Sequence, residues 1–118
     1  MMGKVAFICN GSENCNLYPA FIMGSASVAS GDEVVIFFTP GAVPALKPGY
    51  LESITAKGMP PMKELLEGVV ALGGRMVLCE LGLEAHDVTA EDLRDDIEIG
   101  GATSFMADIK DAKTTFSF

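Results

Sequence analysis

The sequence predicts an α/β fold in which helices cover both faces of a mostly parallel sheet. Apolar runs at residues 4–9, 33–39 and 75–79 are typical of strands buried on both faces. Segments with helical signals separate these runs, and this alternation favours parallel strands joined by helical crossovers. With 118 residues, 49% of them hydrophobic, the chain has the size and composition of one globular domain, which we place over residues 1–118.

A helix is predicted over residues 14–30, directly after the first strand. Asn14 or Asn16 can cap this helix, and Pro19 fits its first turn. Gly31 is placed to end it. Small residues occupy much of its second half, which allows the helix to pack closely on a sheet.

A long connection follows the second strand, residues 33–39. It runs from Pro40 to Met59 and contains several prolines and glycines, so we expect a functional or mobile loop. Pro60 and Pro61 then open a second predicted helix. One face of this helix carries apolar residues at helical spacing, namely Met62, Leu65, Leu66, Val69 and Val70.

The last third of the chain carries shorter signals. Residues 89–92 resemble a capping box at the start of a short helix, and residues 97–99 favour a short fourth strand. Apolar positions mark another helix over residues 102–109. The closing residues 114–118 alternate Thr or Ser with Phe, which predicts a half-buried strand at a sheet edge.

The charge balance excludes several kinds of partner. Sixteen acidic residues against eight basic ones give a net charge of −8, which disfavours nucleic acid and anionic membrane surfaces. The longest uncharged stretch, residues 14–30, is polar in part and too short to span a membrane. The start, Met1–Val5, runs into the first strand without the anatomy of a signal peptide, so we expect a cytoplasmic protein.

Three cysteines lie where a parallel sheet places its functional residues, near the carboxyl ends of strands. Cys9 and Cys79 close two strands, and Cys15 lies near the start of the first helix. If the two strands are close in the sheet, all three thiols can share one rim. Each thiol is either buried filler or a reactive group whose pKa is lowered by a helix N-terminus. The sole histidine, His86, is either a base near Cys79 or a solvated loop residue.

Other chemistries are disfavoured by missing motifs. The sequence has no C-x-x-C pair and no glycine-rich nucleotide loop. A zinc site built from the three cysteines and His86 matches no compact zinc-binding spacing. Half of the acids lie between Glu80 and Glu98, and this segment is either a solvated face or a docking surface for a basic partner.

Several segments, taken in order, resemble one family. They are Glu33–Thr39 with Gly41, Gly73–Cys79, Leu81–Leu83, Glu91–Leu93, Ile99–Ala102 and the closing aromatic strand. Their order and spacing resemble the DsrE/DsrF-like family of small sulfur-relay proteins over nearly the whole chain. The resemblance implies a three-layer α/β/α sandwich on a mostly parallel five-stranded sheet. It also implies homo-oligomers, often trimers or hexamers, and no metal or organic cofactor.

The resemblance also implies a role for one cysteine. In the relay members, a cysteine at the end of the strand before the acidic segment carries sulfur as a persulfide, and this position falls on Cys79. The thiol accepts sulfane sulfur from a donor and passes it to a partner protein. The sequence departs from the relay members directly afterwards, where Glu80 replaces a small polar residue.

Three functions are therefore expected in competition. The protein is a sulfur carrier or sulfurtransferase subunit acting through Cys79, a non-catalytic oligomeric or regulatory module, or a thiol redox sensor that pairs Cys79 with Cys15 or Cys9. The solvent exposure of Cys79 separates the first two, and a distance compatible with a disulfide favours the third. A mean hydropathy of +0.35 favours apolar surface buried between subunits.

Overall fold

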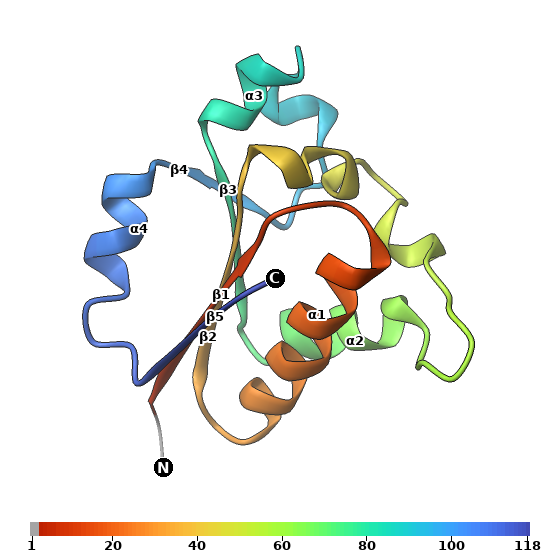
Figure 1. Ribbon diagram of the computed structural model, residues 1–118, viewed down its shortest axis with the longest axis vertical. Helices are drawn as coiled ribbons and strands as arrows, with labels where there is room; N and C mark the ends of the chain where they lie inside the picture. The colour runs from red at the N-terminus through yellow and green to blue at the C-terminus, as the bar shows by residue number, and fades with distance from the viewer. Residues whose placement is uncertain (1–2) are drawn as a thin grey trace.

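Five parallel strands form one sheet in the computed structural model, which describes residues 3–118 (Figure 1). The strands are β1 (Lys4–Cys9), β2 (Glu33–Phe38), β3 (Arg75–Cys79), β4 (Glu98–Gly100) and β5 (Thr114–Ser117). Their order across the sheet is β4-β3-β2-β1-β5, and every neighbouring pair is parallel. Met1 and Met2, which belong to the predicted Met1–Val5 start, lie outside the described residues.

Helices lie on both faces of the sheet, as the sequence predicts. In Figure 1, α1 (Asn14–Ala29) and α2 (Met62–Ala71) cover one face, and the short α4 (Ala102–Asp108) covers the other. A fourth helix, α3 (Leu81–Ala85), stands beyond the carboxyl ends of the strands. The fold is therefore a three-layer α/β/α arrangement with one thick and one thin helical layer. None of the helices in residues 3–118 is long and apolar enough to cross a membrane.

The predicted close packing of α1 on the sheet is confirmed at Gly24. A Cβ atom there would lie 3.4 Å from Cδ1 of Ile36 in β2. The predicted caps are wrong, because the N-cap residue is Glu13 and both Asn14 and Asn16 lie inside the helix. Pro19 lies in the second turn and not in the first as predicted. Asn16 contributes from inside the helix, where its Oδ1 accepts a hydrogen bond from the Glu13 backbone N–H at 3.2 Å.

The segment between residues 40 and 59 is not the open loop that its prolines and glycines predict. It folds into two 3₁₀ helices, Pro40–Leu46 and Leu51–Ser53. The larger cluster of buried apolar side chains, here called the main core, lies between the sheet and helices α1 and α2. Five apolar residues of the segment are fully buried in it: Ala42, Val43, Ala45, Leu46 and Leu51. Burial of these side chains, together with the fixed φ of proline, favours compact turns over a mobile loop.

Two further expectations need correction. Helix α3 follows β3 almost directly, at residues 81–85 of the acid-rich segment, where the sequence predicts no helix. The last strand lies at the sheet edge as predicted, but all four residues of β5 are exposed, so the strand is not half-buried. Phe116 is 37% exposed and stacks on Phe7 of β1 at 5.5 Å between ring centroids. Phe118, just beyond the strand, packs against the main core.

Candidate functional site at the carboxyl end of β3

Cys79 is the last residue of β3, at the edge where open parallel sheets bind ligands. Side chains alternate between the two faces along the strand. Met76 and Leu78 therefore point into the main core under α1 and α2, whereas Val77 and Cys79 belong to a second apolar cluster under α4. This second cluster consists of Ala6, Val35, Phe37, Val77, Cys79 and Phe105.

The Cys79 thiol is buried, and its residue is only 5% exposed. Five of the six residues of the second cluster come from the sheet, and Phe105 comes from α4. The rings of Phe105 and Phe37 stack with 4.3 Å between their centroids. Ile109 and Ala112, which follow α4, pack against the cluster from the same side. The thin helical layer thus covers the thiol.

Cys9 lies on the opposite face of the sheet. It is fully buried in the main core, and its thiol donates weak hydrogen bonds to the backbone oxygens of Gly11 at 3.4 Å and Asn16 at 3.8 Å. Burial raises the pKa of the Cys9 thiol to about 11. At neutral pH this thiol is protonated, and we assign it a packing role.

The three thiols do not share one rim, contrary to the sequence-based expectation. Strand β2 separates β1 from β3, which places the backbones of Cys9 and Cys79 about 9–10 Å apart at the usual strand spacing. Disulfides need Cα atoms within about 7 Å, and these two side chains also point to opposite faces. Cys15 is exposed in the first turn of α1, on the main-core side. All three cysteines are free.

His86 and the three cysteines do not form a metal site in the described residues. His86 is exposed at the end of α3. Within the described part of the chain, no group of three or more His, Cys, Asp and Glu side chains is placed to hold a metal ion.

Glu80, next to the candidate thiol, is turned toward the start of α4. Its backbone N–H donates to the Gly100 carbonyl at 2.9 Å, which extends the pairing of β3 with β4. Its Oε1 lies 3.1 Å from the position that a Cβ on Gly101 would occupy. The carboxylate therefore rests on Gly101, at a point where any side chain would crowd it.

All eight acids between residues 80 and 98 are exposed. Asp92 accepts a hydrogen bond from the Thr89 N–H, whereas Asp96 and Glu98 pair with Arg94 and Arg75. Among residues 3–118, the other five make no ion pair; these are Glu80, Glu84, Asp87, Glu91 and Asp95. The segment is a solvated acidic surface beside the carboxyl edge of the sheet.

Two residues that matter for this site escape sequence reasoning. Phe105 reads as one apolar position of a short helix, and Asp108 reads as a surface acid. The sequence offers one hint of this contact: a charged residue, Arg75, opens the otherwise apolar strand β3 and needs a partner. Its guanidinium reaches Asp108, which is the last residue of α4, at 2.7 Å.

Solved structures share this fold. The ychN protein from E. coli superposes with a TM-score of 0.76 at 19% identity, over 98% of this chain and 99% of that chain. The MTH1491 protein of Methanobacterium thermoautotrophicum superposes with a TM-score of 0.73 at 10% identity, over 97% and 98% of the two chains. At these identities the likeness concerns the fold.

Sequence comparison places the chain in a family. The uncharacterized protein MJ0760 of Methanocaldococcus jannaschii is 27% identical over 90 residues, which are 75% of this chain and 32% of that protein. The chain thus spans about a third of the length of this curated relative. A sequence model of the DsrE/DsrF/DrsH-like family matches residues 44–116, which is more than half of the chain and includes Cys79. The chain belongs to the DsrE/DsrF/DrsH-like family.

Proposed function

We propose that this protein is a sulfur-relay protein that carries sulfane sulfur as a persulfide on Cys79. Family membership suggests a role related to sulfur relay. The observation that carries the choice of residue is the position of Cys79 at the carboxyl end of β3, beside Gly100 of β4. This is the edge where a parallel sheet presents its functional groups.

The proposed chemistry is an exchange at sulfur and needs no added oxidant. The Cys79 thiolate attacks the terminal sulfur of a donor persulfide, R–S–SH. A new S–S bond forms on Cys79 while the donor's S–S bond breaks, and the donor leaves as a thiol after taking up the proton that Cys79 released. The reverse exchange with an acceptor thiol passes the sulfur on and regenerates Cys79.

The other two cysteines are weaker candidates for this exchange. Cys9 is fully buried, and its raised pKa leaves little thiolate at neutral pH. Cys15 is exposed, but it lies on α1, which covers the opposite face of the sheet from the Cys79 side chain. Of the three cysteines, only Cys79 both lies in a segment that resembles the family, Gly73–Cys79, and ends a strand at the carboxyl edge of the sheet.

The acidic surface gives this relay a docking site. Six of its eight acids make no ion pair within residues 3–118, and these six follow Cys79 closely in the chain, between Glu80 and Asp95. A donor or acceptor with a basic surface would be drawn to it, because complementary charge speeds encounter. We further propose a homo-oligomer in the cytoplasm, where a reducing environment keeps all three thiols free.

The burial of Cys79 favours a second candidate, a non-catalytic oligomeric or regulatory module. A thiol that is 5% exposed cannot meet a protein donor without local opening. A redox sensor is less well supported, because the sheet separates Cys79 from Cys9 and from the helix that carries Cys15.

Persulfide formation on Cys79 tests the proposal. The protein is incubated with a cysteine desulfurase and cysteine, or with a small persulfide that needs no docking surface, then alkylated and analysed by peptide mass spectrometry. We expect one added sulfur on the Cys79 peptide, lost in Cys79→Ser and kept in Cys15→Ser. An increment confined to Cys15 or Cys9 contradicts the choice of residue, and no increment with either donor supports the second candidate.

A further inference from the structure

We propose that α4 is a hinged cover over the Cys79 thiol, with the Phe105 ring as its plug and the Asp108 carboxylate as its latch. The consequence for sulfur transfer rests on the proposed function. The cover itself is a property of the fold and is tested separately.

The plug is a single side chain. Within α4, Phe105 is the buried residue, and it is 6% exposed. The outer side of the helix is open, with Met106 59% exposed. Because one ring and the turn after it supply the apolar attachment, α4 is held far more weakly than α1, which buries six residues.

The space beside the plug is not filled. A hollow of about 300 Å³ lies between α4 and strands β3 and β4, and its lining includes Val77, Gly100 and Phe105. The hollow is partly open to solvent, so this face of α4 is not packed tightly against the two strands. Two of its lining residues are neighbours of the site: Gly100 pairs with Cys79 in the sheet, and Phe105 belongs to the same apolar cluster as Cys79.

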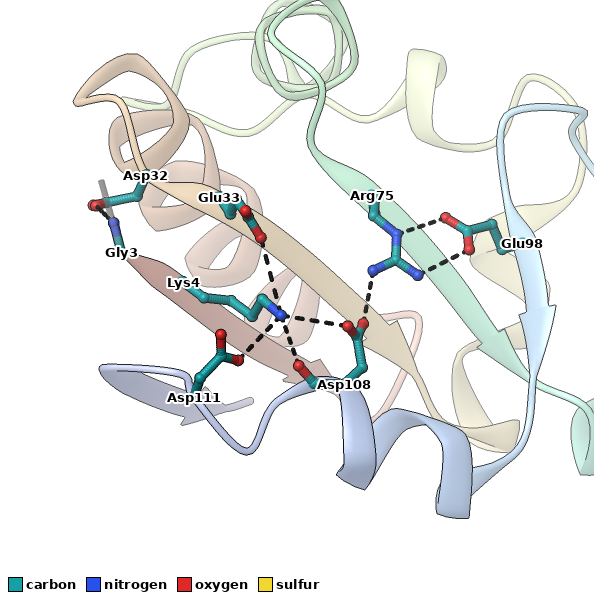
Figure 2. Close-up of polar contacts among 8 residues, drawn as sticks. All are labelled: Gly3, Lys4, Asp32, Glu33, Arg75, Glu98, Asp108 and Asp111. Carbon is teal, nitrogen blue, oxygen red and sulfur yellow. Dashed lines mark hydrogen bonds and ion pairs between the residues drawn. The ribbon is translucent and has the colours of Figure 1, made fainter. Parts of the chain in front are cut away.

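The latch is polar and lies at the far end of the helix. Figure 2 shows Asp108 between two cations from different strands. Arg75 Nη1 donates to Asp108 Oδ2 at 2.7 Å, and Lys4 Nζ donates to the Asp108 backbone oxygen at 2.7 Å and to Oδ1 at 3.3 Å. The hydrogen bond from Arg75 lowers the pKa of Asp108, so the carboxylate is charged at neutral pH. Lys4 also satisfies a carbonyl at the helix C-terminus, where cations are favourable.

The latch is anchored on the sheet. Arg75 is held by Glu98 of β4 through two hydrogen bonds of 2.9 Å, and Lys4 also lies 3.2 Å from Asp111 in the turn after α4 (Figure 2). Asp108 is therefore the α4 side chain that ties the helix to β1 and β3. Loss of the carboxylate removes the Arg75 bond and the Lys4 bond to Oδ1, which weakens this end of α4, while the Lys4 bond to the backbone oxygen remains. Gly101 at the other end supplies a natural hinge residue.

Thiol labelling with iodoacetamide tests the cover, because the three cysteines report three different events. Cys15 is exposed and reports intrinsic reactivity. Cys9 is fully buried on the other face and reports global unfolding. Cys79 reports opening of α4. The ratio of labelling rates between a variant and the wild type, taken for each cysteine, equals the change in its opening equilibrium when labelling is slow.

Asp108→Ala is expected to raise the Cys79 labelling rate about three- to tenfold, the range for loss of a partly exposed ion-pair cluster. Alanine favours helix more than aspartate does, so a weaker helix cannot explain this result. Phe105→Ala is expected to raise the rate at least about tenfold, because the plug is removed directly. Cys15 keeps its wild-type rate in both variants. Cys9 stays much slower than Cys79 in every protein, because its labelling needs global unfolding whereas that of Cys79 needs only the opening of α4.

Glu52→Gln is the matched control. It weakens the paired hydrogen bonds that Glu52 accepts from Arg94 at 3.1 and 2.9 Å, on the main-core side of the sheet. We expect this variant to leave the Cys79 rate unchanged. The cover is overturned if Asp108→Ala leaves Cys79 protected, if Cys79 and Cys9 have the same opening equilibrium in the wild type, or if Glu52→Gln raises Cys79 labelling as much as Asp108→Ala does.

Persulfide formation in the same variants separates this proposal from the relay function. If Cys79 is labelled faster in Asp108→Ala than in the wild type, and neither protein forms a persulfide on Cys79, the result supports the cover and contradicts the relay function. Persulfide on Cys79 at equal rates in the wild type and Asp108→Ala, with unchanged labelling, supports the relay function and contradicts the cover.

Discussion

Gly82 illustrates how a single residue fixes the surroundings of the candidate site. It lies in α3, directly after the Cys79 strand, and it is buried against the first 3₁₀ helix. A Cβ at this position would lie 2.7 Å from Cγ2 of Val43 and 3.3 Å from Cα of Pro40. The absence of a side chain therefore lets α3 dock on the segment that follows β2.

Gly82→Ala is expected to lower the free energy of unfolding by about 1–3 kcal/mol, because the added methyl overfills a packed contact. Gly68→Ala in α2 is the matched control. Its Cβ would meet only Ser25 Cβ at 3.9 Å, so the better helix propensity of alanine should stabilise the protein by up to about 1 kcal/mol. Urea unfolding of both variants measures this difference. Equal effects would contradict the proposed crowding at Gly82.

The position of Cys79 could be predicted from the sequence, but its burial could not. An apolar run that ends in cysteine places the thiol at the end of a strand, and the alternation of strand and helix places that end at the functional edge. Its cover comes from Phe105, which is 26 positions later in the chain. Which face of the sheet α4 covers depends on strand order, and a local pattern does not encode strand order.

At the scale of elements, long apolar runs predict strands better than prolines predict loops. The cores of β1, β2 and β3 follow from their buried apolar runs. The prolines and glycines between Pro40 and Met59 predict a functional or mobile loop, whereas five apolar side chains in this segment are buried and hold it in compact turns. Helix α3 spans five residues and carries no periodic pattern, so its existence depends on tertiary contacts such as that of Gly82.

Arg94 holds the acidic segment, residues 80–98, against the side of the fold that carries α1 and α2. Its guanidinium bonds to both carboxylate oxygens of Glu52 and also to Asp96, and its side chain is 9% exposed. The backbone N–H of Arg94 donates to the Leu46 carbonyl at 2.9 Å. Arg94 therefore joins the acidic segment to the 3₁₀ helices Pro40–Leu46 and Leu51–Ser53. These contacts fix the surface on which we expect partners to dock.

Glu52→Gln is expected to destabilise the protein by about 0.5–1 kcal/mol at pH 7, because the Glu52 side chain is partly exposed. The hydrogen bond from Arg94 lowers the pKa of Glu52 in the folded protein. A carboxylate whose pKa is lower in the folded protein stabilises the fold at pH values above its unfolded-state pKa. This stabilisation is lost as the pH falls through the folded-state pKa. The difference between wild type and variant should therefore shrink below about pH 4.3, the ordinary glutamate value. Urea midpoints from pH 7 to pH 3 measure it, and a constant difference would contradict a charged pair.

At the scale of the whole molecule, large apolar side chains remain exposed on several sides. Leu72 is 60% exposed, Leu81 68% and Met106 59%, and Ile99 on the edge strand β4 is 38% exposed. We expect part of this surface to be buried against further copies of the chain. The net charge of −8 acts in the opposite direction, because like-charged copies repel one another.

These two forces predict an assembly that salt strengthens. We expect trimers or hexamers, with masses three or six times the 12.4 kDa of one chain, in sedimentation velocity experiments at micromolar concentration. Raising the salt concentration from about 0.05 to about 0.5 M shortens the Debye length several-fold and weakens the repulsion, so the larger species should gain population. If ion pairs between copies held the assembly instead, salt would dissociate it. A single 12.4 kDa species at every salt concentration would show that the exposed apolar residues serve other partners, and it would leave the relay proposal to a monomer.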